Sequence, residues 1–485
     1  NVSSVIEMPR KRNQFLQLLS VIKSSSLFLI VVLLFVFCVL LSFSSKATIP
    51  QTHDVRSFKA RKFCSSSPAE RFLFYAPHSG FSNQLSELKN AFLIAGILNR
   101  TLVVPPVLDH HAVVLGSCPK FRVTEPRDIR TSFWNHSLDL LNSGRYVSMT
   151  EIIDVSSLVP SSVRTIDFRV FASILCNIDA NGACANAQTG KPSMFEQIKL
   201  CGSEALGFRI ESANCLYSVD NDCRNTVWTY ESGEKDRTKD SLQPDEQLKK
   251  KKKISHVRLR RDVYKELGPN SAAGSFKVLA FGSLFTSLYK NSQLLIDINK
   301  PHTNAKINSL TKKLEFLPFV SEIMNAGRTI SSQIIKSPFL CAQLRLLDGQ
   351  FKNHWEATFL GLKQKVESLK TDTYPVHIFV MTDLAQEKWV GTYLGELLRD
   401  NEHYRIHVVR EDDEVVVETA KKVANLGDMG GLKDGILVRK LPNVLLYVEE
   451  AVCSCASLGF VGTTGSTIAE SIDIMRKHRV CNLMN

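Results

Sequence analysis

Polar side chains that bind anions or accept protons follow several apolar segments of this chain. The stretch Pro77-His78-Ser79-Gly80-Phe81-Ser82-Asn83-Gln84 lies between an apolar run at 71–75 and a helical pattern over 85–98. A strand that breaks before a helix leaves backbone N–H groups at the helix N-terminus, where an anion or a sugar can dock. His78 is a candidate general base for a hydroxyl acceptor, or a histidine that only hydrogen-bonds the loop. Asn83 offers an uncharged donor and acceptor.

Two charged residues end expected strands further along the chain. Arg345 follows the apolar segment 339–344, and its planar fork suits a diphosphate. Asp383 ends the next strand, where it accepts hydrogen bonds from a base or a ribose, or else caps the following helix. A structural pairing of Arg345 with Asp348 or Asp383 is the alternative. The carboxyl ends of parallel strands face the ligand-binding crevice, so both residues are candidates for binding.

A turn rich in small residues and hydroxyls, Gly462-Thr463-Thr464-Gly465-Ser466-Thr467, follows the apolar strand 458–462. Its backbone N–H groups and the hydroxyls of Ser466 and Thr467 would cradle a phosphate at a helix N-terminus. Serine and threonine also cap helices without any ligand. The turn has neither the Gly-Lys-Ser/Thr of a Walker loop nor the GxGxxG spacing, which argues against ATPases and NAD enzymes.

Metal-binding patterns are weak in this sequence. Asp109 precedes His110 and His111, but adjacent side chains on a strand point to opposite faces. No Asp-x-Asp motif stands at a strand end. We therefore predict no metal site, and no carboxylate stands directly beside His78 to mark a general base.

These residues must be positioned by strands and helices that alternate along the chain. The segment 71–104 has a strand–loop–helix–strand pattern, and from 338 onward apolar strands alternate with amphipathic helices. The expected strands are 339–344, 377–381, 405–409 and 458–462, and the expected helices are 355–369, 386–398 and 443–455. The sequence predicts an α/β fold with two Rossmann-like domains that face each other across a cleft.

A membrane anchor is predicted ahead of these domains. The apolar run from 27 carries no charge, and the gap between Lys23 and Lys46 is long enough to cross a bilayer. Positive residues precede it, which predicts a cytosolic N-terminus and a lumenal remainder; a cleaved signal peptide is the alternative. The expected segments are a cytosolic tail (1–26), an anchor (27–45), a stem (46–70), a first domain (71–330) with a disordered charged insert at about 231–253, and a second domain (331–485).

Cysteines and sequons agree with a lumenal location. Eleven of the twelve cysteines follow the anchor, where disulfides can form. Those in the middle lack the paired CxxC spacing of a zinc site, so we predict disulfides of open pairing among Cys176, Cys184, Cys201, Cys215 and Cys223. Asn99 and Asn135 begin glycosylation sequons. A large share of the net charge of +12 lies in the cytosolic flank and in a lysine run at 249–253 with the nearby Arg258, Arg260 and Arg261, so nucleic-acid binding is not predicted.

The chain resembles the protein O-fucosyltransferase family, in particular its plant members. The resemblance rests on segments 80–84 with 98–106, then 343–345, 379–383 and 460–471, in this order, and it covers most of the chain from about Arg71. It implies the glycosyltransferase B arrangement, with an acceptor-side first domain and a nucleotide-sugar-binding second domain. It also implies an inverting transfer of fucose from GDP-fucose to a hydroxyl, with no cofactor and no bound metal.

The resemblance also implies roles for particular residues. Arg345 would neutralise the donor β-phosphate, Asp383 would lie near the nucleoside, and Asn83 would lie by the reacting centre. With His78 added from the first turn on the residues alone, the expected catalytic set is His78, Asn83 and Arg345. The expected donor-binding set is Gly80, Phe81, Ser82, Arg345, Asp383, Gly465, Ser466 and Thr467.

This chain departs from the family pattern at the donor side. Gln343 stands where the family usually has a histidine, and some relatives have arginine or a second glycine at the places of Gly80 and Ser82. UDP-rhamnose is therefore an alternative donor, and a catalytically silent glycan-binding scaffold is an alternative function. The expected partners are a nucleotide sugar, a glycoprotein or cell-wall polysaccharide acceptor, and the Golgi membrane in type II orientation, with the endoplasmic reticulum as the alternative.

Overall fold

The structure is a computed structural model that describes residues 70–108, 126–159, 162–176, 194–207, 215–219, 228–229, 261–284, 305–347, 351–369, 375–426 and 440–481. The predicted cytosolic tail, the anchor, the charged insert and all but the last residue of the stem lie outside these residues. Within the described ranges, no helix is both long and apolar enough to cross a membrane. All described residues belong to one compact unit, Lys59–Asn485.

The N-terminal part of this unit is built on a five-stranded parallel sheet with the order β3-β2-β1-β7-β4. The strands are β1 (Phe72–Phe74), β2 (Thr101–Val104), β3 (Thr165–Asp167), β4 (Leu216–Val219) and β7 (Val278–Phe281). The chain passes from β1 to β2 on one side and later returns to β7 on the other. The topological switch point, where ligands of open parallel sheets bind, is therefore at the carboxyl ends of β1 and β7.

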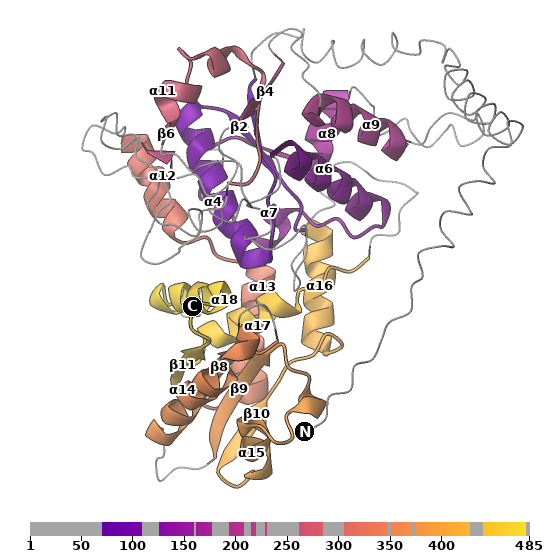
Figure 1. The fold of residues 1–485 in the computed structure, drawn as a ribbon. Coiled ribbons are helices and arrows are strands. Elements are labelled where there is room, and N and C mark those ends of the chain that lie inside the picture. Colours follow the sequence, from indigo (N-terminus) through magenta and orange to yellow (C-terminus); the bar gives the residue numbers. More distant parts are fainter. Residues whose placement is uncertain are drawn as a thin grey trace, which may run out of the picture. The chain divides into compact units, whose positions relative to one another are not determined.

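The C-terminal part contains a four-stranded parallel sheet with the order β10-β9-β8-β11 (Figure 1). The strands are β8 (Phe339–Leu344), β9 (Val376–Thr382), β10 (Tyr404–His407) and β11 (Gly459–Gly462). Here the chain runs from β8 to β9 to β10 and comes back to pair β11 with the free edge of β8. Gln343 is the register partner of Gly462, so the second switch point lies just beyond these two residues.

Alternating side chains divide the core of each sheet into two faces. On β1, Phe72 and Phe74 belong to a cluster under one face, whereas Leu73 belongs to a cluster under the other. The first cluster is covered by α6 (Pro126–Asn142), α8 (Phe168–Cys176) and α9 (Met194–Gly207). On the second sheet, Leu340 and Ala342 face a separate cluster covered by α14 (Trp355–Ser368) and α15 (Tyr393–Arg399). Successive side chains of a strand point to opposite faces of its sheet, which is why one strand contributes to two clusters.

One continuous apolar cluster joins the remaining faces of both sheets. It includes residues of helices on the first sheet, namely α4 (Phe81–Leu98), α7 (Met149–Ile152), α11 (Val263–Leu267) and α12 (Ala305–Glu315). It also includes residues of α13 (Ser321–Thr329), α16 (Glu414–Leu426), α17 (Leu445–Ser454) and α18 (Thr467–Lys477). Helices α4 and α18 are in contact, as are α13 and α17 (Figure 1). The predicted α/β class with two parallel sheets is thus confirmed.

Short elements complete the described fold. They are the strand pair β5 (Trp228–Thr229) and β6 (Arg261–Asp262), the 3-10 turns η3 (Ala272–Ser275), η6 (Phe351–Asn353) and η7 (Gln386–Lys388), and the π-helical turn η5 (Ile330–Ile335). The helix predicted over 386–398 is wrong in its first half, where η7 ends at a turn. Gly391 has φ of 81° there, and the buried Trp389 donates its Nε1–H to the Leu384 carbonyl at 2.9 Å. A left-handed residue breaks a helix, so α15 begins after it.

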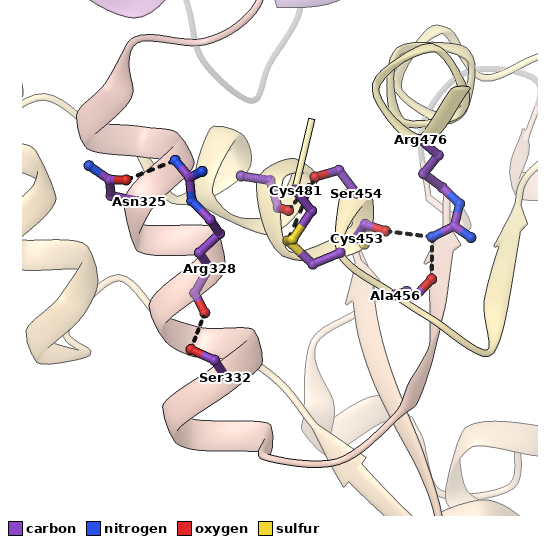
Figure 2. Close-up of a disulfide and its surroundings, with 10 residues drawn as sticks. Asn325, Arg328, Ser332, Cys453, Ser454, Ala456, Arg476 and Cys481 are labelled. Atoms are coloured by element: carbon purple, nitrogen blue, oxygen red, sulfur yellow. Dashed lines mark hydrogen bonds between the residues drawn. A yellow bond between two sulfur atoms is a disulfide. The ribbon is translucent and has the colours of Figure 1, made fainter. Parts of the chain in front are cut away.

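Disulfides tie the helices to each other and to the second sheet. Cys176 pairs with Cys201, Cys341 with Cys453 and Cys455 with Cys481, and Cys215 is also disulfide-bonded. The Cys341–Cys453 bond joins β8 to α17. Figure 2 shows Arg476 of α18 directed at the end of α17, where its Nη1 donates to the carbonyls of Cys453 (3.2 Å) and Ala456 (2.5 Å). The predicted disulfides are confirmed for Cys176, Cys201 and Cys215, whereas Cys184 and Cys223 lie outside the described residues.

Candidate active site

The first candidate turn lies at the switch point of the five-stranded sheet, directly after β1. His78 is buried, with 2% of its surface exposed, and its Nδ1 lies 2.8 Å from Oε1 of Glu87 and 3.0 Å from Oγ of Ser283. Ser79 has φ of 65°, which is uncommon outside glycine. The loop is therefore held in one defined conformation by side chains from α4 and from the segment after β7.

Glu87 joins the loops that follow β1 and β7. Its Oε1 accepts a hydrogen bond from the backbone N–H of His78 at 3.0 Å. Its Oε2 accepts from the Ser283 hydroxyl at 3.0 Å and from the backbone N–H of Leu284 at 2.8 Å. A carboxylate is only an acceptor, so the Nδ1 beside it carries the ring proton and Nε2 is the basic nitrogen of the neutral imidazole. A carboxylate that orients a histidine in this way is the usual partner of a general base.

Sequence reasoning missed Glu87 and Ser283, although a signal for Glu87 was present. Gln84, Glu87 and Asn90 follow one another at helical spacing on α4, and all three are buried. Gln84 donates to the Ser79 carbonyl at 2.8 Å and accepts from the N–H of Leu108 at 3.0 Å. Asn90 donates to the Leu284 carbonyl at 2.7 Å. Buried polar residues in an otherwise apolar stripe need partners, and here the partners are the site loops.

The helix N-terminus itself carries the other predicted residues of this turn. Gly80 is the N-cap of α4, and Ser82 and Asn83 are partly exposed on its first turn. The Phe81 side chain is 3% exposed, and its ring centroid lies 4.5 Å from that of Tyr447 on α17. Phe81 therefore offers a ligand its backbone N–H rather than its ring. The predicted donor contacts of Gly80, Phe81 and Ser82 remain predictions.

Arg345 and the turn after β11 meet at the second switch point. The Arg345 N–H donates to the Thr463 hydroxyl at 2.9 Å, while the Thr463 N–H and hydroxyl both reach the Gln343 carbonyl, at 3.0 and 3.3 Å. The Arg345 guanidinium lies 5.2 Å from the Phe351 ring centroid. Thr463, which is 3% exposed and which sequence analysis did not single out, thus locks the end of β8 to the end of β11.

Asp383 supports the segment that follows Arg345. Its two carboxylate oxygens accept hydrogen bonds from the N–H groups of Leu346 at 2.7 Å and Leu347 at 3.0 Å. A carboxylate oxygen has two lone pairs, so these bonds leave room for a further donor from a ligand. Its place near the nucleoside stays a prediction.

The N-terminus of α18 stands beside this segment. The Ser466 hydroxyl caps the helix by accepting from the Ala469 N–H at 3.5 Å, which uses a lone pair and leaves the O–H proton to donate. Gly465 has φ of 77°, and a Cβ added there would meet no atom within 4 Å. Gly465 is exposed and Thr467 partly exposed. An anion at this end of α18 meets first-turn N–H groups and the positive end of the helix dipole.

A buried carboxyl group lies on α17, the helix that packs between β8 and α18. Glu450 has no exposed surface, and burial raises its pKa to about 8, although the Ser471 hydroxyl on α18 acts in the opposite direction. Burial and the neighbouring Glu450 also raise the pKa of Glu449. Glu450 is therefore protonated near neutral pH.

Replacing Glu450 by glutamine is expected to stabilise the protein more at about pH 8 than at about pH 5. A carboxyl whose pKa rises from 4.5 to about 8 on folding stabilises least at high pH: stability falls by about 1.4 kcal/mol per pH unit between these values. A glutamine amide does not ionise, so its burial does not become less favourable as the pH rises. Urea unfolding midpoints across this range measure the effect, with Glu414→Gln, an exposed position on α16, as the control. Parallel pH curves for wild type and Glu450→Gln would contradict it.

Metal ligands do not gather among the residues that the structure describes, since no group of three or more His, Cys, Asp and Glu side chains is close enough to hold an ion. Asp109, His110 and His111 lie outside those residues. The expectation that the site needs no metal stays a prediction.

Comparisons with known proteins agree on one family. The sequence model of the family described as GDP-fucose protein O-fucosyltransferase matches residues 72–377. The protein O-fucosyltransferase 30 of Arabidopsis thaliana is 55% identical over 430 residues, which are 85% of this chain and 84% of that protein. Among solved structures, POFUT1 in complex with GDP-fucose matches at 14% identity over 85% of this chain and 96% of that chain (TM-score 0.40). The fucosyltransferase NodZ from Bradyrhizobium matches at 12% identity over 83% and 93% (TM-score 0.33).

Proposed function

Because this chain belongs to the GDP-fucose protein O-fucosyltransferase family, we propose that it transfers fucose from GDP-fucose to a hydroxyl of a glycoprotein or a cell-wall glycan. The resemblance predicted from the sequence is thereby confirmed at the level of the family. We further propose a glycosyltransferase B arrangement, with the five-stranded half on the acceptor side and the four-stranded half on the nucleotide side.

The observation that carries this proposal is that the predicted motifs lie at the two topological switch points. The turn with His78 and Asn83 follows β1, beside the end of β7. Arg345 follows β8, beside the turn after β11. Ligands of open parallel sheets bind at such switch points, so this placement supports a binding role for both motifs.

The chemistry follows from what each switch point offers. In transfer, the acceptor oxygen bonds to the anomeric carbon of fucose while the bond from that carbon to the diphosphate oxygen breaks and GDP leaves with the electron pair. Arg345 and the first turn of α18 stabilise the charge that develops on the diphosphate. His78, with Nδ1–H fixed by Glu87, takes the acceptor proton on Nε2. Attack opposite to the leaving group inverts the anomeric carbon, and no step requires a metal.

A nucleotide-sugar panel tests this function. Calorimetric titration of the protein with GDP-fucose, UDP-rhamnose and GDP-mannose is expected to show binding of GDP-fucose, followed by slow release of GDP with water as the acceptor. If the protein bound UDP-rhamnose and not GDP-fucose, UDP-rhamnose would be the donor instead. The basis for that alternative is Gln343, which stands where the family usually has a histidine; it lies near the carboxyl end of β8 and is 2% exposed. Glycan binding without any nucleotide binding would favour the silent scaffold.

We propose a lumenal location for the catalytic part, with residues 27–45 as a type II Golgi anchor. The disulfides support this proposal, because they persist in oxidising compartments and are rare in the cytosol. Asn99 begins a sequon and is exposed, as a glycosylated asparagine must be. The endoplasmic reticulum remains the alternative compartment.

A further inference from the structure

Three aromatic rings connect the candidate catalytic turn of the first sheet with the helices of the second. The ring centroid of Phe81 lies 4.5 Å from that of Tyr447 and 6.3 Å from that of Phe319, and those of Phe319 and Tyr447 are 5.5 Å apart. The rings are 3%, 4% and 0% exposed, respectively for Phe81, Phe319 and Tyr447. Such tilted ring pairs prefer defined geometries, so this cluster resists sliding more than an aliphatic contact does.

Phe81 is rigidly connected to the residue proposed to lie by the reacting centre. It is the first residue of α4, and Asn83 follows two positions later on the same helical turn. Two residues along a helix turn the side chain by about 200°. Phe81 therefore points into the apolar cluster while Asn83 points away from it, and the backbone of one turn links their positions.

Tyr447 is connected just as directly to the nucleotide side. It lies on α17, and Cys453 of the same helix is bonded to Cys341 of β8. Strand β8 continues into Gln343 and Arg345. A displacement of α17 is thus transmitted through a covalent bond to the strand that carries the proposed phosphate ligand.

The connecting segment closes the cluster from a third side. Phe319 precedes α13 and forms an isolated bridge with Ile153, beside the first sheet's helix α7. Helix α13 packs against α17, where a Cβ added at Gly327 would lie 2.6 Å from that of Ala451. The two helices approach so closely that α17 has little freedom to move under Phe319.

We propose that Phe81 and Tyr447 are positioning residues that set the placement of Asn83 relative to Arg345. This inference rests on the proposed function, because it assumes that one residue serves the sugar and the other the diphosphate. Transfer requires Asn83 and Arg345 to lie within a narrow range of distances from each other, and a misplacement of about 1 Å costs roughly 100-fold in rate. Neither ring touches donor or acceptor; both act through the elements that carry them.

The test compares Phe81→Leu with Phe92→Leu in the full chain. Phe92 is a fully buried phenylalanine of the same helix that belongs to none of the three ring pairs, so its replacement controls for lost core volume. With GDP-fucose as the probe and water as the acceptor, Phe81→Leu is expected to lower kcat about tenfold while donor Kd changes less than about threefold. Phe92→Leu is expected to keep kcat within about twofold of wild type.

Variants at the second ring make the coupling explicit. Tyr447→Leu is expected to behave like Phe81→Leu, and the double variant to lose no more than about twofold beyond either, because both remove the same link. Tyr447→Phe keeps the ring and is expected to keep kcat. A Phe81→Leu protein with the turnover of Phe92→Leu would overturn the inference. A loss of donor affinity at unchanged kcat would overturn it as well, since it would mean that the ring contacts the donor.

Hydrogen exchange separates this inference from the proposed function. Phe81→Leu is expected to speed amide exchange in α17 and at 339–347 relative to Phe92→Leu, whether or not GDP-fucose is the donor. A wild-type protein that neither binds nor hydrolyses GDP-fucose refutes the proposed function, yet faster exchange in those segments still supports the link between the rings. Identical exchange in the two variants refutes the link even in an active enzyme.

Discussion

Replacing Arg345 by alanine is expected to lower the release of GDP from GDP-fucose by about 100- to 1000-fold, the usual effect of removing one donor that stabilises transition-state charge. The arginine stands at the second switch point, where its backbone is fixed by Thr463 at 2.9 Å. Its guanidinium stacks on Phe351 at the surface rather than filling the core, so the fold should survive. Rates of GDP release and far-ultraviolet circular dichroism measure the two effects.

Two further variants show whether the loss is specific to this arginine. Arg345→Lys keeps the charge but not the planar fork, and is expected to retain only part of the activity. Arg410→Ala removes an exposed arginine that follows β10, on the same edge of the sheet but away from the switch point. It should leave the rate unchanged. Near-normal turnover in Arg345→Ala would remove this residue from the site.

Replacing His78 by asparagine is expected to lower turnover at least about 100-fold while GDP-fucose affinity stays within about threefold. The asparagine amide supplies an N–H close to the place of Nδ1, so the hydrogen bond to Glu87 can persist while the basic Nε2 is lost. This variant therefore distinguishes a catalytic base from a histidine that only holds the loop by its hydrogen bond to Glu87. Kinetics of GDP release and calorimetric donor binding are the measurements.

A purely structural histidine would give the opposite result. If His78 only ties the loop after β1 to Glu87, then His78→Asn would keep wild-type turnover and His78→Ala would lose it together with stability. Ser283→Ala is the matched control, because it removes one donor to Glu87 at 3.0 Å and leaves the imidazole in place. It is expected to cost stability by about 1 kcal/mol and turnover only slightly.

Strands of both sheets were predictable from sequence where they form continuous buried apolar runs, as in β2 and β8. The segments 101–104 and 339–344 are β2 and β8 to the residue. Helix boundaries were harder to predict. Helix α4 begins at Phe81, four residues before the apolar pattern at 85–98, because Gly80 and the polar first turn carry no periodic signal. The helix predicted over 386–398 was wrong in its first half, because the spacing of apolar residues does not show that Gly391 adopts a left-handed backbone conformation.

The site was predictable where a residue stands at the end of a strand. The positions of Arg345 and Asp383 directly after β8 and β9 were predicted in this way, because parallel order brings such ends to one edge, and their roles in a site stay predictions. Glu87 and Thr463 were not, since their roles depend on partners that become neighbours only in the folded chain: Ser283 for Glu87 and Gln343 for Thr463. The disulfide pairs were undetermined for the same reason. The sequence therefore indicates which residues are candidates for the site, whereas their hydrogen-bond partners are known only from the folded structure.

The strand order of the second sheet also has a consequence for biosynthesis. Strand β11 pairs with β8, and Cys453 with Cys341, although the two cysteines are 112 residues apart. On the ribosome, β8 and Arg345 are made long before their partners, so a nascent chain carries an open strand edge and an unoxidised thiol for most of that interval. The nucleotide side can form only after 459–467 has been synthesised. A frameshift or nonsense codon shortly before Gly459 would therefore yield a product that lacks β11, the turn with Ser466 and α18, so the second switch point could not form.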